Sequence, residues 1–396
     1  MTAETTFRVS TPAELIATLP YVIGFHPADS IVVVAVRGQK IVFAARHDLP
    51  EPAVPAAVVR EEAARMAALV ASQGVTGTTV IGYGEAARVT PTVLRVVEAL
   101  RRAGLPVLDQ LRVTAGRYWS YPCTDDDCCP AAGRECLPTD SVIAAEATFA
   151  GAVALPDRAA LIALIAPDAC LAPSGPARQR LAALFAGEAQ RVGSERRVRR
   201  AGREAVRAAE RCYHAGGRLA DDEVAWLAAL LVHLPVRDYA WERTGDAPSW
   251  TALWTDVVRR VEPAYVPAPA CLLAFAAWRA GNGALARVAV DRALAQEPAY
   301  SMAGLLDEML RLALHPRLLA DWPTAQPGRV DQPQPGRSAV EQPLPGRSAV
   351  DQPQPGRSAV DQPQPGRSAV EQPQPGRSAV DQRLGRSSRR RRGRAV

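Results

Sequence analysis

The fold is decided by two apolar runs near the start of the chain, IVVVAV at residues 31–36 and IVFAAR at residues 41–46. Both runs are rich in β-branched side chains, and the short connection between them predicts a hairpin. After the hairpin, helix and strand patterns alternate, in the order 54–72, 78–83, 90–103 and 105–114. This alternation predicts an α/β domain over residues 1–138, built on a mixed sheet with a hairpin and parallel crossovers.

Two Thr-Pro pairs mark expected helix starts in this domain. At Thr11-Pro12, Thr11 can cap the helix and Glu14 can complete a capping box, so a helix is expected to about Leu19. Thr90-Pro91 is expected to open a second helix. Gly82-Tyr83-Gly84 then does not lead straight into a helix and lacks a third glycine, so a tight turn is favoured over a phosphate loop.

The pattern beyond the α/β domain is helical almost without interruption, which predicts an all-α region over residues 139–320. One long helix is expected at residues 176–215. Small residues between Gly281 and Pro298 have a spacing that resembles one tetratricopeptide helix pair. Because a single pair cannot build the groove of a repeat array, ordinary helix packing is the stronger interpretation.

Residues 321–396 form a tail in which a ten-residue unit begins at Asp331 and recurs at 341, 351, 361 and 371. Each unit holds two prolines and a glycine, which oppose helix and interior strand. One valine in each unit cannot bury enough surface to offset the loss of chain entropy. The tail is therefore predicted to be disordered, and it ends in an arginine cluster from Arg383 to Arg394.

The net charge of +6 belongs to this tail. Residues 321–396 hold 13 Arg against 7 Asp or Glu, whereas residues 1–320 hold 34 basic and 34 acidic side chains. A neutral body argues against a polyanion-binding surface there. Weak polyanion contact is expected only through Arg383 to Arg394.

The sequence also bears on the cellular compartment. Residues 1–10 are polar, and no run of about twenty apolar residues could span a bilayer, so no membrane contact is expected. Four of the seven cysteines lie between Cys123 and Cys136. An odd number with this clustering is typical of thiols or metal ligands in a reducing compartment. We therefore expect a cytoplasmic protein without a disulfide scaffold.

Five short segments, each found once along the chain, form a distinctive set. The most distinctive is LPYVIGFHPADSIVVV at residues 19–34, and the others are WSYPC at 119–123, CCP at 128–130, AAWRAG at 276–281 and AYS at 299–301. Together they resemble a bacterial family known as domain of unknown function 4192, over roughly residues 10–315 and excluding the tail. The resemblance implies an actinobacterial cytoplasmic protein and no assigned activity, so it implies no mechanism.

Several segments are expected to meet at one edge of the predicted sheet. Antiparallel pairing places the loop at residues 24–30 beside residues 46–47, and both lie near the end of strand 78–83. The segment 119–136 is expected at the same edge. In open α/β sheets, ligands bind beyond the carboxyl ends of parallel strands. The predicted ligand-binding residues are Tyr83, Glu85 and Trp119.

The loop at this edge contains the residue types of a hydrolytic triad, His26, Asp29 and Ser30. They are the candidate catalytic residues. However, triad members normally come from separate elements that hold them at fixed angles, and these three lie within five positions. The alternative is that His26 shapes a turn and that Asp29 or Ser30 satisfies loop amides.

Four cysteines in one loop are the candidate metal ligands: Cys123, Cys128, Cys129 and Cys136. Four thiolates are the number that a structural zinc ion needs. Their spacing differs from the two close pairs of zinc ribbons, so a packed loop or a redox-responsive thiol pair is the alternative. No cofactor is predicted apart from this zinc alternative.

These features favour a cytoplasmic binding or regulatory module, with an unidentified small molecule or protein held at the strand-end edge. The first alternative is a hydrolytic or metal-assisted enzyme at the same edge, using His26, Asp29, Ser30 and the cysteine loop. The second alternative, weak nucleic-acid binding, depends on the basic tail alone.

Overall fold

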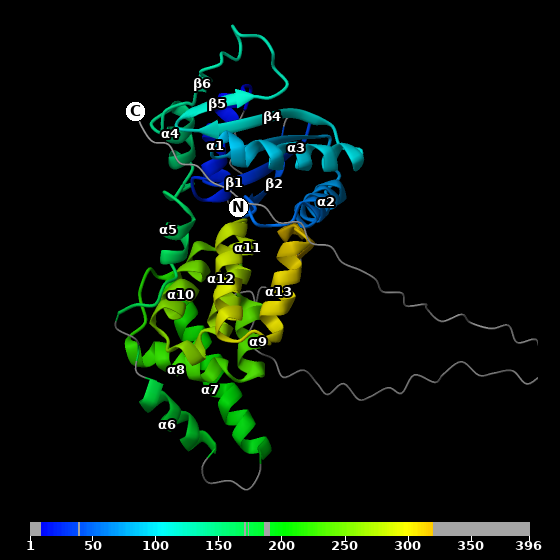
Figure 1. Ribbon diagram of the computed structural model, residues 1–396. Coiled ribbons are helices and arrows are strands. Elements are labelled where there is room, and N and C mark those ends of the chain that lie inside the picture. The colour runs from blue at the N-terminus through cyan, green and yellow to red at the C-terminus, as the bar shows by residue number, and fades with distance from the viewer. Residues whose placement is uncertain (1–8, 39, 170–171, 173, 186–190, 320–396) are drawn as a thin grey trace, which may run out of the picture. The chain divides into compact units, whose positions relative to one another are not determined.

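The computed structural model describes residues 9–38, 40–169, 172, 174–185 and 191–319 (Figure 1). All of these residues belong to one compact unit, Met1–Asp331. The repeat tail predicted to be disordered, with its arginine cluster, lies outside the described residues. Among the helices in the described ranges, none is both long enough and apolar enough to cross a bilayer.

A six-stranded mixed sheet forms the N-terminal part. Its strands are β1 (Ser30–Arg37), β2 (Lys40–Asp48), β3 (Gly77–Tyr83), β4 (Val107–Thr114), β5 (Arg117–Ser120) and β6 (Arg134–Glu135). Their spatial order is β2-β1-β3-β4-β5-β6; β3 and β4 pair in parallel, and the other neighbours are antiparallel. The hairpin and the parallel crossover confirm the predicted α/β fold class.

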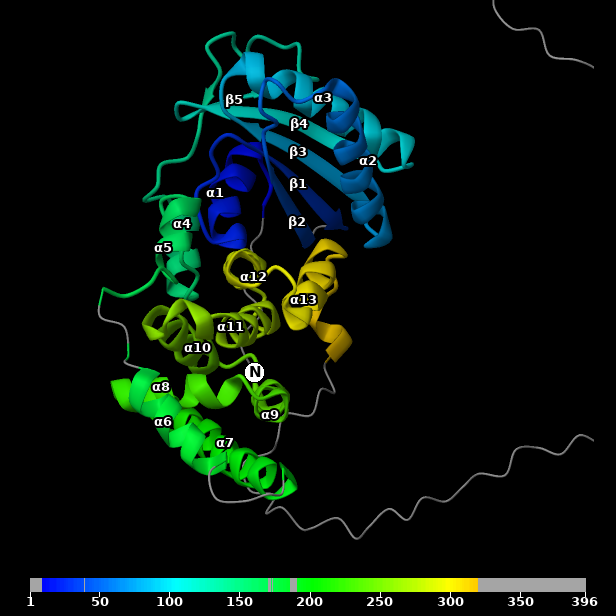
Figure 2. The ribbon, with the colours of Figure 1, turned by 60° about the horizontal axis from the view of Figure 1, so that its bottom comes forward.

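Helices cover both faces of this sheet (Figure 2). On one face, α2 (Ala56–Ser72) and α3 (Ala86–Arg102) bury a core that includes Val80 of β3. On the other face, α1 (Pro12–Ile23) packs around the next residue of the same strand, Ile81. Because successive strand residues point to opposite faces, the near-continuous apolar character of β1 and β3 follows from burial on both sides.

The expected helix starts have different outcomes. At Thr11 the capping box with Glu14 is present and α1 begins at Pro12, although the helix continues to Ile23 instead of ending near Leu19. The expected start at Thr90-Pro91 is wrong, because α3 begins at Ala86 and contains the proline.

Packing against β3 explains the early start of α3. A Cβ added at Gly82 would lie only 2.2 Å from Cγ1 of Val89, so the first turn of the helix rests directly on the strand. Gly84, with a φ of 132°, turns the chain from the strand into the helix. Burial of Val89 offsets the cost of Pro91 inside the helix. Gly82-Tyr83-Gly84 therefore does lead straight into a helix, contrary to the expectation.

The segment after β4 also departs from the prediction, because it folds back along the sheet. Trp119 of β5 pairs with Arg112 of β4, and the Tyr121 N–H donates to the Gln110 carbonyl at 2.8 Å. The chain thereby moves away from the carboxyl end of β4. β6 then returns along β5 and brings Cys136 back to that end, where its N–H donates to the Gly116 carbonyl at 2.8 Å.

The remaining described chain is helical, which confirms the predicted all-α region. Its helices are α4 (Val142–Phe149), α5 (Arg158–Ala163), α6 (Ser174–Phe185), α7 (Arg191–His214), α8 (Asp221–Leu231), α9 (Leu234–Arg243), α10 (Pro248–Arg260), α11 (Pro267–Arg279), α12 (Gly283–Gln296) and α13 (Ser301–Arg311), with 3-10 turns at Pro263–Tyr265 and Pro316–Leu319. Trp254 of α10 and Phe275 of α11 are the largest fully buried side chains of its core.

Two predictions were made for particular helices of this region, one at residues 176–215 and one at residues 281–298. The stretch expected as one helix at residues 176–215 contains α6 and α7, and residues 186–190 between them lie outside the described part. α11 and α12 pack against each other across the turn at Gly281, which has a φ of 80°. Any antiparallel helix pair has this arrangement, so the tetratricopeptide-like interpretation stays a prediction.

Candidate functional site

Strand register brings the loop before β1 to the end of β3. Ser30, the first residue of β1, pairs with Asp48 of β2 on one side and with Tyr83 of β3 on the other. The preceding loop is held to this position because the Leu49 N–H donates to the Asp29 carbonyl at 2.8 Å. The loop, the end of β2 and the end of β3 therefore meet at one edge of the sheet, which we call the strand-end edge.

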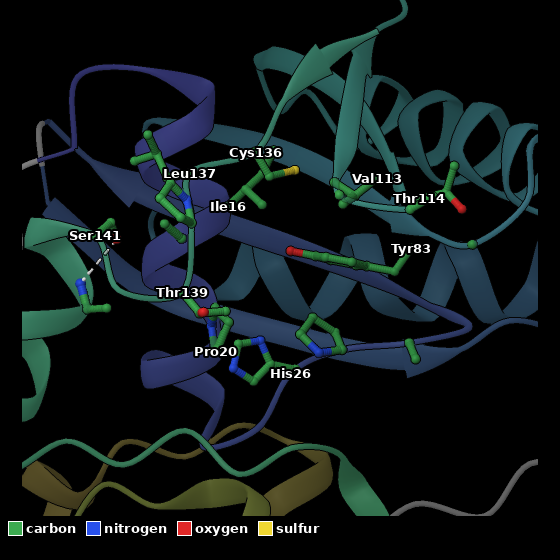
Figure 3. A pocket seen from close by; sticks show the side chains of 18 of the residues that line it. Ile16, Pro20, His26, Tyr83, Val113, Thr114, Cys136, Leu137, Thr139 and Ser141 are labelled. Carbon is green, nitrogen blue, oxygen red and sulfur yellow. Dashed lines mark hydrogen bonds between the residues drawn. The ribbon is translucent and has the colours of Figure 1, made fainter. Parts of the chain in front are cut away.

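A cavity of about 580 Å³ lies at this edge (Figure 3). Its lining comes from α1 and from residues 26–29, 83–85, 113–116 and 136–144. Ile16, Pro20, Val113 and Leu137 contribute apolar wall. We call this cavity the strand-end pocket.

Tyr83 is the most deeply placed polar residue of the pocket. It extends into the cavity, toward α1 and Cys136 (Figure 3), yet its side chain is 7% exposed. Its hydroxyl has no hydrogen-bond partner among the described residues. Burial first, and then the charge of Cys136, raise the pKa of Tyr83, so the hydroxyl stays protonated and can donate.

Two more buried polar atoms, which have no hydrogen-bond partner in the described part of the chain, lie on the strands beside Tyr83. One is Oγ of Ser30, and the other is Nε of Arg46 on β2. Arg46 pairs with Val32, whose side chain belongs to the α1 face of the sheet, and Ser30 lies two residues before Val32 on the same face. Three unsatisfied atoms at one end of one sheet face are unusual, because most buried polar groups in folded proteins are hydrogen-bonded.

The rim of the pocket is acidic. Asp29 adopts a left-handed conformation with a φ of 40°, and its carboxylate accepts a hydrogen bond from Arg88 at 2.9 Å. The Glu85 carboxylate accepts from the Thr114 hydroxyl at 3.4 Å. Among the residues that the structure describes, neither Lys nor Arg lines the cavity itself. An anionic ligand would therefore meet two carboxylates and no cation in the lining.

The three triad candidates differ in burial and in their hydrogen-bond partners. His26 and Asp29 line the pocket, but Asp29 is ion-paired with Arg88 and the His26 backbone N–H donates to the Leu155 carbonyl at 2.9 Å. Ser30 is fully buried and does not line the cavity. Within the described residues, no hydrogen bond joins any two of the three side chains.

Trp119, which was predicted as a ligand-binding residue at the strand-end edge, does not line the strand-end pocket. It stands on β5, where the Arg112 guanidinium lies 3.7 Å from the centre of its ring. Its Nε1–H donates to the Ala131 carbonyl at 3.1 Å, and a Cβ at Gly133 would lie 2.5 Å from the ring. The side chain is thus packed under the loop that follows β5.

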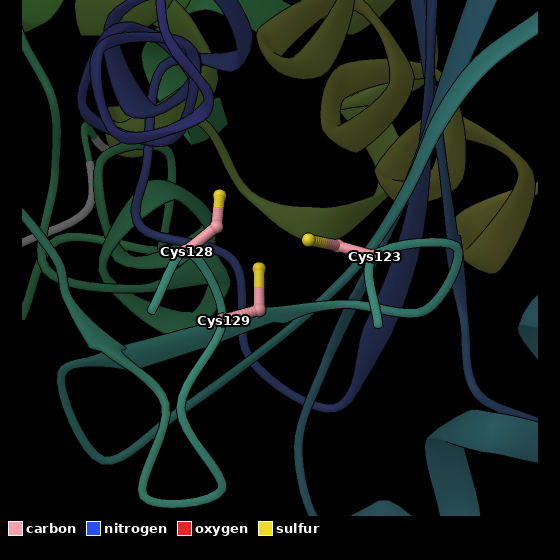
Figure 4. A group of neighbouring side chains, drawn as sticks. All are labelled: Cys123, Cys128 and Cys129. Carbon is pink, nitrogen blue, oxygen red and sulfur yellow. The ribbon is translucent and has the colours of Figure 1, made fainter. Parts of the chain in front are cut away.

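The cysteine loop brings together three of its four thiols (Figure 4). The Sγ atoms of Cys123, Cys128 and Cys129 all lie within 4.8 Å of one another. Cys136 is not part of this group, because β6 carries it along β5 to the strand-end pocket. The structure thus brings together three of the four predicted metal ligands, and Cys123, Cys128 and Cys129 are called the cysteine trio below.

The electrostatics of the trio differ from one thiol to the next. A hydrogen bond from the Asp125 backbone, and then one from the Cys129 thiol, lower the pKa of Cys123. Desolvation, followed by the hydrogen bond with Cys123, raises the pKa of Cys129 to about 11. Cys123 is the thiol of this pair that ionises first.

Sequence reasoning missed Arg88, the residue that holds Asp29 in place. The position of Arg88 depends on the start of α3 at Ala86, because that start places Arg88 in the first turn of the helix, where it pairs with Asp29 of the loop. The apolar spacing that starts at Val89 is the signal that could have extended the helix backward across Pro91. The predicted polyanion contact at Arg383 to Arg394 lies outside the described residues.

Comparison with known proteins identifies a family. No curated protein and no solved structure matches the chain. A sequence model described as "Domain of unknown function (DUF4192)" matches residues 12–317. The matched range includes the sheet, the strand-end pocket, the cysteine trio and all described helices. The chain therefore belongs to the DUF4192 family of domains of unknown function.

Proposed function

We propose that this protein is a binding module that holds a small organic molecule, neutral or cationic, in the strand-end pocket. The observation that carries the proposal is the Tyr83 hydroxyl, which is buried, protonated and unpartnered and which extends into the cavity. An unsatisfied buried hydroxyl costs about 1–3 kcal/mol. A ligand atom that accepts its hydrogen bond would offset this cost.

The size and walls of the cavity support a small-molecule ligand. Ligand pockets of about 300–1,000 Å³ are usual for metabolite-sized molecules, and they combine apolar walls with a few polar groups. The strand-end pocket has this composition, with Ile16, Val113 and Leu137 as walls and Tyr83 as the interior polar group. Its place beyond the carboxyl ends of β3 and β4 is the usual position of ligands in such sheets.

The charges support a neutral or cationic ligand over a phosphate. The start of α3 behind Gly84 would by itself attract an anion. However, Glu85 occupies the N-cap position of that helix, and although its side chain makes no capping hydrogen bond it places a carboxylate there; Asp29 adds another at the rim. Arg88 neutralises Asp29, which leaves Glu85 as the uncompensated charge of the lining. A ligand amine could occupy the space beside Glu85.

Binding is proposed instead of hydrolysis because of how the three triad candidates are placed. Ser30 Oγ has no access to the cavity, and Asp29 is engaged by Arg88 instead of by His26. We further propose that the module works in the cytoplasm and has a regulatory role, because a ligand that fills the pocket would bridge α1, the 26–29 loop and the 136–144 segment. The six described cysteines are unpaired, in keeping with a reducing compartment.

A compound screen tests the proposal. Full-length protein would be heated with matched sets of neutral, amine-bearing and phosphorylated metabolites, and hits would be titrated calorimetrically. We expect neutral or amine compounds to raise the melting temperature. In Tyr83→Phe the dissociation constant of a hit should rise about 5–10-fold, as the loss of one hydrogen bond predicts.

Tyr121→Phe is the matched control. The Tyr121 hydroxyl bonds the Thr90 hydroxyl at 2.8 Å and lies outside the pocket lining. Its removal should leave ligand affinity unchanged. Equal weakening in both variants, or a preference for phosphorylated compounds, would contradict the proposal.

A further inference from the structure

We propose that Cys123, Cys128 and Cys129 form a three-thiolate site for a thiophilic metal ion, with zinc as the ion. The site is separate from the strand-end pocket, since none of these cysteines lines that cavity. It is also independent of the proposed ligand-binding function.

The geometry is close to that of an occupied site. Zinc–sulfur bonds of about 2.3 Å in a tetrahedron place the sulfur atoms roughly 3.8 Å apart. The three Sγ atoms already lie within 4.8 Å of one another, and the thiol of Cys123 points toward Cys128 and Cys129 (Figure 4). Small side-chain movements would bring the sulfur atoms to bonding positions, and Cys128 is exposed.

A compact turn holds two adjacent cysteines toward the third. The Asp125 carboxylate accepts from the backbone N–H groups of Asp127 at 3.0 Å and Cys128 at 3.4 Å. The Asp125 carbonyl accepts from the Cys129 N–H at 2.6 Å. Asp125 is thus occupied in shaping the loop. Its bonds explain how neighbouring residues in sequence can both present sulfur to Cys123.

Hydrogen-bond donors surround the sulfur atoms. The Asp125 backbone N–H bonds the Cys123 sulfur, and the Ser120 backbone N–H bonds that of Cys129. Nη1 of Arg134 lies 3.8 Å from Cys128 Sγ and also donates to the Cys128 carbonyl at 3.1 Å. Such donors stabilise thiolates and orient metal ligands. One nearby arginine also offsets part of the negative charge of three thiolates around a divalent ion.

The donor set indicates the class of metal. Three sulfur ligands select soft or borderline ions and discriminate against magnesium and calcium, which prefer oxygen. Zinc with three protein ligands keeps a fourth position for water or an external ligand. Because the thiols must lose their protons on binding, metal affinity should increase with pH.

Metal titration of the reduced full-length chain tests the site. After zinc loading and dialysis, the wild type should retain about one equivalent of zinc. Cobalt substitution should produce a thiolate-to-metal charge-transfer band. Cys123→Ser and Cys129→Ser should each weaken zinc binding by more than about 100-fold, beyond the usual effect of losing a supporting group.

Cys136→Ser is the matched control, because this cysteine belongs to the same segment but stands at the strand-end pocket. It should keep both the zinc equivalent and the cobalt band. Circular dichroism of every variant would show that the fold is retained. The proposal is overturned if the reduced wild type retains no zinc, or if Cys123→Ser and Cys136→Ser bind it equally.

Discussion

A polar cluster in the helical region is extensively hydrogen-bonded, whereas three buried polar atoms at the strand-end edge have no hydrogen-bond partner among the described residues. In the helical region, Asp256 of α10 accepts hydrogen bonds from Tyr213, from Arg218 at 2.8 Å and from Arg260 at 2.6 Å. Arg260, which is 4% exposed, also bonds Asp221 and the Leu219 carbonyl. At the strand-end edge, by contrast, Ser30, Arg46 and Tyr83 each leave a buried atom without a hydrogen bond.

The difference in hydrogen bonding distinguishes a polar group that stabilises the fold from a polar group that is available to a ligand. A fully bonded network fixes the positions of α7, α8 and α10 relative to one another. A buried polar atom without a hydrogen bond lowers the stability of the fold, so its presence beside a cavity calls for another explanation. We infer that the hydrogen-bonded cluster around Asp256 is structural and that the Tyr83 hydroxyl belongs to a binding site.

Removal of a partner from the satisfied cluster should have the largest effect. Arg260→Ala leaves Asp256 and the Leu219 carbonyl short of a donor in a largely buried place. We expect the free energy of unfolding to fall by about 3–5 kcal/mol, measured by urea denaturation. Arg259→Ala, at the adjacent and less buried position, should cost less than about 1 kcal/mol. Similar losses in both variants would show that the cluster has no special structural role.

The same cluster predicts a loss of stability in acid. Burial alone would raise the pKa of Asp256, but hydrogen bonds from Arg218, Tyr213 and Arg260 outweigh it and lower the pKa below its ordinary 3.8. A carboxyl with a lowered folded-state pKa stabilises the fold above its unfolded-state pKa, and this stabilisation is lost as the pH falls through the folded-state value. Unfolding free energies measured down a pH series should therefore decline below about pH 4.

Asp256→Asn supplies the control for this pH dependence. The variant should be less stable at neutral pH, since an amide accepts weaker hydrogen bonds from arginine, and its acid decline should be shallower than that of the wild type. An unchanged acid slope would assign the pH dependence to other carboxyl groups.

The sequence predicted the sheet better than the helices that cover it. The runs 31–36 and 41–46 are short and β-branched, and the chain between them leaves little choice of pairing, so the hairpin and the edge where it meets β3 followed directly. The start of α3 did not follow, because local rules place Pro91 at a helix start whereas the contact of Val89 with Gly82 is a tertiary one. Tertiary packing overrode the local signal.

The same contrast between local signals and tertiary packing applies to the site residues. The position of Tyr83 beside the loop followed from strand pairing, but its lack of a hydrogen-bond partner depends on the side chains of several elements and has no sequence signal. The separation of Cys136 from the other three cysteines was not predicted, because β5 and β6 are too short to be recognised as strands. β5 folds back along β4 and carries the chain toward the cysteine trio, and β6 then returns Cys136 to the strand-end pocket.

We expect the smallest effect on stability at Tyr83. Substitution there directly tests whether the Asp256 cluster and the Tyr83 hydroxyl differ in their contribution to the fold. Tyr83→Phe removes a hydroxyl that makes no hydrogen bond, so the free energy of unfolding without ligand should stay unchanged or rise by about 1 kcal/mol. Tyr213→Phe makes the same chemical change where the hydroxyl bonds Asp256, and it should lower stability by about 1–2 kcal/mol. A loss of stability at the partly buried Tyr213 without a loss at the buried Tyr83 would establish that the fold does not need the Tyr83 hydroxyl. If Tyr83→Phe were as destabilising as Tyr213→Phe, the hydroxyl would be part of the protein's own hydrogen-bond network, and the pocket would lose its principal ligand-binding group.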